Sequence, residues 1–135
     1  MKHIVSPENP IVKKAMSLKQ RKVREKEGLY LIEGPHLCEE ALGAAENIDV
    51  LMIRESIYRN TANNEFSDII ERSLEMGVKA ILVEDKIFDR LMNTETPQGL
   101  GAIMRCRRWN PESFFSADQA DGHGNVLVLD RIQDP

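Results

Sequence analysis

Three short stretches of the chain carry side chains suited to binding chemistry. Residues 1–27 hold a dense set of Lys and Arg, Glu33-Gly34 follows an apolar segment, and residues 93–99 read NTETPQG. Lys and Arg bind phosphates, whereas hydroxyl, amide and carboxylate groups form hydrogen bonds with sugars, bases or peptide groups. The residue types therefore favour recognition of a ligand over covalent chemistry.

A self-contained active site cannot be identified. The three histidines lie far apart in the sequence and lack the spacing of a metal motif, and the two cysteines form no CxxC pair. The chain contains neither a P-loop nor a GxGxxG motif, and its Ser and Cys side chains have no identifiable base partner. We therefore predict no catalytic residue, no cofactor site and no metal site in this chain.

The charge of the chain is distributed unevenly. Residues 1–27 carry eight Lys or Arg against three acidic residues, and residues 28–135 carry ten against nineteen, which together give the net charge of −4. A basic arm on an acidic body is typical of proteins that contact polyanions. The solvated face of a surface helix has the same composition, and charge alone does not separate the two interpretations.

Length and composition indicate a single cytoplasmic globular domain. The 135 residues include 41% hydrophobic residues, which suffices for a core. No apolar stretch approaches the roughly 20 residues of a membrane-spanning helix, and the N-terminus lacks the apolar segment of a secretory signal. The two cysteines fit reduced thiols of a cytosolic protein.

The hydrophobic pattern predicts alternating helices and strands. Asn9 and Pro10 are typical of a helix start, and this helix with its continuation extends to Gly28. Further helices are expected from Pro35, around residues 66–76 and after Asp85, with Leu37, Leu74 and Met76 among the side chains that face the core. The predicted strands are Leu29–Glu33, Asp49–Ile53, Val78–Val83 and Leu100–Cys106. This order predicts an α/β fold, a layered α/β/α domain around a roughly four-stranded mixed sheet.

The two polar stretches are expected at strand ends, where binding groups of open α/β sheets gather. Glu33 ends an apolar strand and needs a partner such as a backbone N–H or an Arg, while Gly34 allows a close approach. Thr94, Thr96 and Gln98 offer donors and acceptors that suit RNA sugars and bases. Alternatively, Glu33 caps the following helix and residues 93–99 form a tight turn.

Taken together, these motifs resemble those of SpoU-type (TrmH-like) RNA 2′-O-ribose methyltransferases. The family pattern begins with Asn-Pro-x-[Val/Ile]-Lys, a basic helix, an apolar strand, Glu-Gly and a helix containing Glu-Ala. It continues with Thr-x-x-Pro-Gln-Gly and a strand leading to Asp-Pro. The matching positions are Asn9, Pro10, Val12, Lys13, Glu33, Gly34, Glu40, Ala41, Thr94, Pro97, Gln98, Gly99, Leu129, Asp130, Asp134 and Pro135.

The resemblance implies two domains in the full-length enzyme. The first is a substrate-recognition domain similar to kink-turn-binding ribosomal proteins, and the second is a knotted SPOUT domain that binds S-adenosylmethionine and dimerises. The Gly-Asn-x-Gly loop and catalytic Arg that follow Asp-Pro in the family are not present in this sequence. We therefore expect residues 1–106 to recognise RNA, 107–124 to form a linker and 125–135 to begin the SPOUT domain, and we expect this chain alone to be inactive.

The RNA contacts are expected from the basic helix and the two polar stretches. The predicted RNA-binding residues are Asn9, Lys13, Lys14, Arg21, Arg24, Glu33, Gly34, Thr96 and Gln98. The RNA is ribosomal or transfer RNA, and the apolar strand at 126–129 could also mediate self-association. Two alternatives remain at this point: a free-standing RNA-binding module without enzymatic activity, and a domain that binds an acidic protein partner.

Overall fold

The computed structural model describes residues 1–60 and 66–107, and in these residues one mixed sheet of five strands forms the centre of the domain. The strands are β1 (Lys2–Ile4), β2 (Leu29–Glu33), β3 (Ile48–Arg54), β4 (Ala80–Val83) and β5 (Leu100–Arg105), in the spatial order β1-β4-β3-β5-β2. β5 is antiparallel to both of its neighbours, whereas β1, β4 and β3 are parallel to one another. The predicted α/β fold with a mixed sheet is confirmed, and β1 is an additional strand too short to show a hydrophobic pattern.

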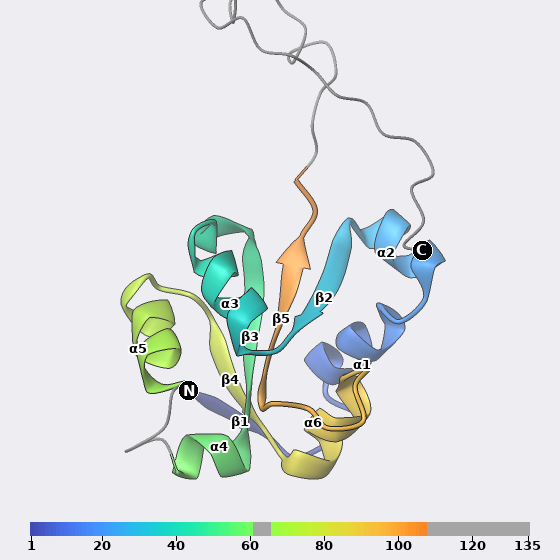
Figure 1. Cartoon of the computed structure of the whole chain (residues 1–135). Helices are drawn as coiled ribbons and strands as arrows, with labels where there is room; N and C mark the ends of the chain where they lie inside the picture. The colour runs from blue at the N-terminus through green and yellow to red at the C-terminus, as the bar shows by residue number, and fades with distance from the viewer. Residues whose placement is uncertain (61–65, 108–135) are drawn as a thin grey trace, which may run out of the picture.

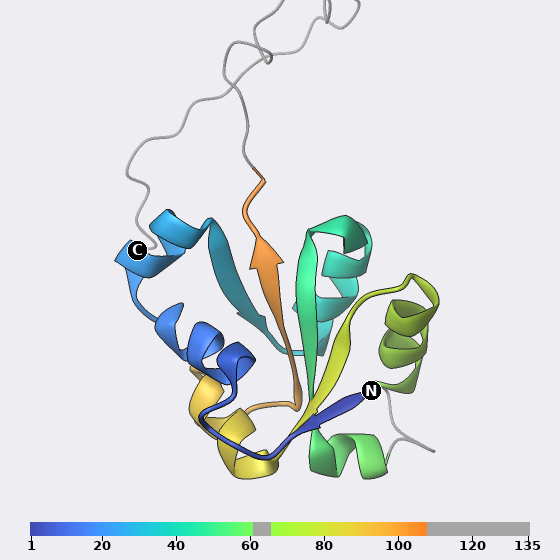
Figure 2. The same ribbon diagram turned by 180° about the vertical axis from the view of Figure 1, so that it is seen from behind.

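Helices cover both faces of this sheet. They are α1 (Pro10–Ser17), α2 (Arg21–Glu27), α3 (Pro35–Leu42), α4 (Glu55–Arg59), α5 (Ser67–Glu75) and α6 (Asp85–Leu91), with a short 3-10 turn at Ala45–Asn47. α1 and α6 lie on one face and α3 and α5 on the other (Figure 1), and the view from behind shows the same layers (Figure 2). The described part of the chain is thus the predicted α/β/α sandwich.

Each face of the sheet has its own hydrophobic core. The first core joins α1 and α6 to β3 through residues such as Ala15, Phe88 and Met52, and the second joins α3 and α5 through Leu42 and Ile53. Successive residues of β3 alternate between the two cores because side chains along a strand point to opposite faces. Each fully buried side chain contributes roughly 1.5–3 kcal/mol, so the two cores hold the strand ends in fixed positions.

The predicted N-terminal helix and its continuation are two separate helices. Asn9 caps α1 as expected, its side chain accepting a hydrogen bond from the backbone N–H of Ile11 at 2.9 Å. Gly28 ends α2 in the left-handed conformation, φ 63°, also as expected. Between the helices, Arg24 Nη1 donates to the backbone oxygens of Leu18 and Lys19, each at 2.9 Å. This guanidinium satisfies carbonyls that a continuous helix would have paired internally.

Some boundaries and orientations differ from the prediction. Leu37, Leu74 and Met76 were expected to face the core, but they are 46%, 48% and 51% exposed, because α3 and α5 bury only one narrow stripe each. The strand predicted from Val78 begins at Ala80, since the N–H of Val78 still bonds to the end of α5. Helix α4 was not predicted at all.

Residues 108–135 lie outside the described residues, and with them most of the predicted linker and the predicted strand at 126–129. Among the helices of residues 1–60 and 66–107, none has the length and apolar character needed to cross a membrane.

Candidate nucleic-acid interface

Helix α2 presents its cations to solvent. None of its residues is buried, and it rests on the first core through the partly buried Val23. Arg21 pairs with Glu25 at 2.7 Å on the same helix, and this hydrogen bond and charge attraction raise the pKa of Arg21. Lys22 and Lys26 are exposed and form no ion pair within residues 1–60 and 66–107. α2 therefore carries four cations against two acidic residues, which gives its exposed surface a net positive charge.

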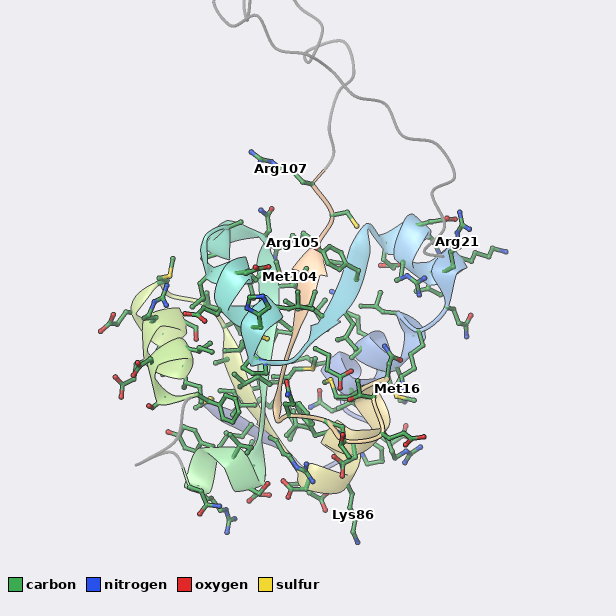
Figure 3. The ribbon with its side chains drawn as sticks, in the orientation of Figure 1. Met16, Arg21, Lys86, Met104, Arg105 and Arg107 are labelled. Atoms are coloured by element: carbon green, nitrogen blue, oxygen red, sulfur yellow. The ribbon has the colours of Figure 1, made fainter. Side chains whose placement is uncertain are left out.

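The end of β5 places two more arginines at the same end of the sheet as α2. The backbone N–H of Cys106 donates to the backbone oxygen of Gly28 at 2.7 Å, which joins the end of β5 to the end of α2. Figure 3 shows Arg21, Arg105 and Arg107 along the same end of the sheet. We call this surface the basic end; its residues are Arg21, Lys22, Lys26, Arg105 and Arg107.

Arg105 and Arg107 were not among the predicted binding residues. They are about 80 positions from α2 in sequence, and no local pattern connects them with it. Both residues lie at the end of a predicted strand, and this position is the signal that could have found them. It would also have required the knowledge that this strand pairs antiparallel with β2, so that Arg105 lies opposite Leu29.

Lys14 and Arg105 are held at this end of the sheet by one carboxylate. Asp49 accepts from Lys14 Nζ at 3.1 Å and from Arg105 at 2.7 Å. Partial burial opposes ionisation of Asp49, but the hydrogen bonds and charges of the two cations outweigh it and lower its pKa. The predicted site residue Lys14 thus lies near the basic end while having a structural partner.

At the other end of β2, Glu33 binds the loop at residues 93–99. Its carboxylate accepts from the backbone N–H of Asn93 at 2.9 Å, from that of Thr94 at 3.4 Å, and from the Thr94 hydroxyl. The predicted backbone partner of Glu33 is confirmed. The alternative in which Glu33 caps the next helix is wrong, since α3 has no side-chain cap. A carboxylate so engaged acts as a brace for the loop.

Two glycines fix the end of the same loop. Gly34 has φ 97°, and a Cβ there would stand 3.1 Å from Oε1 of Gln98, so the two residues are in close contact. Gly99 has φ 93°, and its Cβ would stand 2.4 Å from Cγ1 of Ile57 in α4. Both positions require glycine. We call Glu33, Gly34 and residues 93–99 the turn site.

Thr96 and Gln98 are exposed on this braced loop, as recognition groups would need to be. Two other predicted residues lie elsewhere. The Asn9 side chain is used in the α1 cap. Lys13 pairs with Glu8 beside a pocket of about 250 Å³ between α1 and α6, where Met16 and Arg90 are also found (Figure 3).

The predicted binding residues are therefore divided between the two ends of β2. β2 has five residues, so its first and last residues lie roughly 13 Å apart, at about 3.3 Å for each step along the strand. A depression of about 290 Å³ lies between them, lined by Lys19, Arg24, Tyr30 and Asn93 among others. Arg24 contributes to this depression but its guanidinium is bound to backbone carbonyls.

Comparison with known proteins gives a family match. The family described as MRM3-like substrate binding domain matches residues 9–102. The chain is also 30% identical, over its full length, to the 23S rRNA (guanosine(2553)-2′-O)-methyltransferase RlmP of Bacillus subtilis, of which it covers 46%.

Two solved structures extend the comparison. A crystal structure of an RNA 2′-O ribose methyltransferase aligns with 82% of this chain and 40% of its own, with a TM-score of 0.61 and 25% identity. An AdoMet-bound rRNA methyltransferase from Sinorhizobium meliloti aligns with 78% of this chain and 37% of its own, with a TM-score of 0.59 and 23% identity, and thus shares the fold. The chain spans less than half the length of these proteins.

Proposed function

The chain belongs to the family of MRM3-like substrate binding domains, and we propose that it is the RNA-recognition part of an RNA 2′-O-ribose methyltransferase. Relatives named as RNA methyltransferases are about twice as long as this chain, which favours a part of an enzyme over a free-standing module. The observation that carries the proposal is the basic end, where cations from two distant segments lie along one end of the sheet of an otherwise acidic chain.

In this proposal the two ends of β2 have different roles. Arg21, Lys22 and Arg107 contact phosphates, with nonspecific affinity as the result. Thr96 and Gln98 form hydrogen bonds with riboses or bases, for which their exposure on a fixed loop suits them. Glu33 and Gly34 position that loop, because the carboxylate would repel a phosphate and is already bonded to the loop.

Salt-dependent binding tests this proposal. A labelled single-stranded RNA of mixed sequence should bind with an affinity that falls as salt rises, and the Arg21→Ala/Lys22→Ala variant should flatten the log–log slope by roughly 1.4, about 0.7 for each lost phosphate contact. The matched control is Arg59→Ala/Lys86→Ala, which removes the same charge at the opposite end of the sheet, where Figure 3 shows Lys86. Equal slopes for the two variants would contradict the proposal.

S-adenosylmethionine, which supplies the methyl group when bound, is assigned in this proposal to the rest of the enzyme. Two pockets of the described residues carry more positive than negative side chains on their borders, which does not favour the positively charged sulfonium. Lys13 and Arg90 stand against Glu8 between α1 and α6. Arg105 and Arg107 stand against Glu40 beside Tyr30. We expect this chain neither to bind S-adenosylmethionine measurably nor to methylate RNA, and saturable micromolar binding of the cofactor in calorimetry would refute that expectation.

The full-length enzyme is proposed to be a homodimer, and the apolar segment at residues 126–129 could pair with a second copy of this chain. Light scattering on the chain and on a version ending at Arg108 would test the second idea. If the chain and the shortened version have the same oligomeric state, pairing through that segment is excluded.

A further inference from the structure

An exposed tyrosine borders an apolar pocket next to the basic end. Tyr30 lies opposite Met104 in the antiparallel pair of β2 and β5, and opposite residues of such a pair share a face. Met104 belongs to the second core, so the Tyr30 ring lies on the α3 side of the sheet. The ring is 37% exposed although its neighbours Leu29 and Leu31 pack into the first core.

The pocket has the composition of a site for a planar apolar group. Its volume is about 350 Å³, within the range of roughly 300–1,000 Å³ found for small-molecule sites. Ile32, Ala41 and Met104 contribute apolar surface, and Leu37 lines it together with Tyr30. Leu37 is the α3 side chain that was expected in the core and is instead 46% exposed.

The polar border of the pocket gives its occupant an orientation. Arg107 lines the pocket and belongs to the basic end, whereas Glu40 of α3 lines it too and pairs with His36 at 3.4 Å. A phosphate is attracted toward Arg107 and repelled from Glu40. Because β2 is the edge strand of the sheet, a chain molecule can approach the pocket from the side without displacing a strand.

We propose that this pocket binds one unpaired RNA base, stacked on Tyr30 with its phosphate toward Arg107. The inference rests on the proposed function and adds to it a preference for unpaired nucleotides. Aromatic side chains next to cationic surfaces bind single-stranded nucleic acids by stacking, and a base within a duplex cannot present its face in this way. The site lies on the path between the basic end and the turn site, which a strand of a few nucleotides would follow along β2.

The experiment compares four proteins on two RNAs. Wild type, Tyr30→Leu, Tyr30→Phe and Tyr58→Leu are titrated with a labelled single-stranded RNA of mixed sequence and with a blunt RNA duplex. Tyr58 is the matched control, since it is the second tyrosine of the chain, is 40% exposed and lies on α4, which does not line the pocket. Urea unfolding of each variant confirms that the fold is retained.

Tyr30→Leu should bind the single-stranded RNA about five- to tenfold more weakly than wild type, which corresponds to the lower part of the range for base–aromatic stacking. Its affinity for the duplex should not change. Tyr30→Phe should keep wild-type affinity, and so should Tyr58→Leu. If Tyr30→Leu binds the single strand as wild type does, or weakens both RNAs equally, the stacking site is refuted while the proposed function stands. If wild type shows no salt-dependent RNA binding at all, the proposed function itself fails.

Discussion

The two ends of β2 differ in where their polar groups find partners. At the turn site, Glu33 is bonded to Asn93 and Thr94, and Gly34 and Gly99 hold the loop against Gln98 and Ile57. At the basic end, Lys22 and Lys26 have no ion-pair partner within the described ranges, Arg21 has one exposed partner on its own helix, and Arg105 is held by Asp49.

One strand can thereby serve two tasks. A site that reads the shape of a ligand needs groups fixed in advance, because ordering them on binding would reduce affinity. Long-range attraction of a polyanion needs only charge, and flexible exposed cations supply it. Variants at the turn site should therefore change stability, and variants at the basic end should change the salt dependence of binding.

The largest expected effect is at Gly99. Gly99→Ala introduces a Cβ 2.4 Å from Ile57 at a φ of 93°, and should lower the free energy of unfolding by about 2–5 kcal/mol. Gly77→Ala is the matched control, with φ 73° but no atom within 4 Å of its Cβ, and should cost about 1–2 kcal/mol. Urea unfolding measures both, and equal losses would mean that the loop is not fixed against α4.

The next effect is the loss of the brace at the turn site. Glu33→Ala leaves the N–H of Asn93 and the polar groups of Thr94 without their acceptor, and should reduce the free energy of unfolding by about 1.5–3 kcal/mol. Glu95→Ala in the same loop is the control and should change it by less than about 0.5 kcal/mol. Stability of Glu33→Ala equal to that of Glu95→Ala would show that the carboxylate does not hold the loop.

A smaller loss of stability is expected for Arg24 of α2, whose guanidinium binds backbone carbonyls, and a still smaller one for Arg21, which forms an exposed ion pair. Arg24→Ala removes two hydrogen bonds to backbone carbonyls and should cost about 1–2 kcal/mol of unfolding free energy. Arg21→Ala removes one exposed ion pair within the helix, which solvent screens, so it should reduce the free energy of unfolding by less than Arg24→Ala does. Thermal unfolding of both variants tests this order, and the reverse order would assign Arg24 to solvent.

The smallest effect concerns Asp49 and depends on pH. Lys14→Ala should lower the unfolding free energy by about 0.2–1 kcal/mol at pH 7. The pKa of Asp49 is lowered in the folded state, so its contribution is fully present above the unfolded value of about 4 and is lost as the pH falls through the lower folded value. The difference between wild type and Lys14→Ala should therefore shrink below about pH 4, and a constant difference would contradict the pairing.

Local signals in the sequence predicted much of the fold. The Asn9-Pro10 cap, the Gly28 terminator and the alternating strands depend on nearby residues, and the structure confirms them. The break before α2 could not be predicted in this way, because it depends on Arg24 reaching back to the carbonyls of Leu18 and Lys19. β1 is three residues long and pairs only through its distant partner β4.

The candidate site was likewise predictable only where it depends on neighbouring residues in the sequence. The need of Glu33 for a backbone partner follows from an acidic residue at an apolar strand end. That Asn93 and Thr94 supply the partner, and that Arg105 and Arg107 join α2, depends on β5 lying between β3 and β2. The spatial order of strands is a property of the whole chain, and no single motif encodes it.

The division of roles along β2 is tested most directly by two double variants measured over a range of salt concentrations on the same single-stranded RNA. Arg21→Ala/Lys22→Ala should flatten the slope of log affinity against log salt by roughly 1.4. Thr96→Ala/Gln98→Ala should lower affinity at every salt concentration and leave the slope unchanged, because it removes hydrogen bonds and no charge. A flattened slope for the turn-site variant together with an unchanged slope for the basic-end variant would contradict the account.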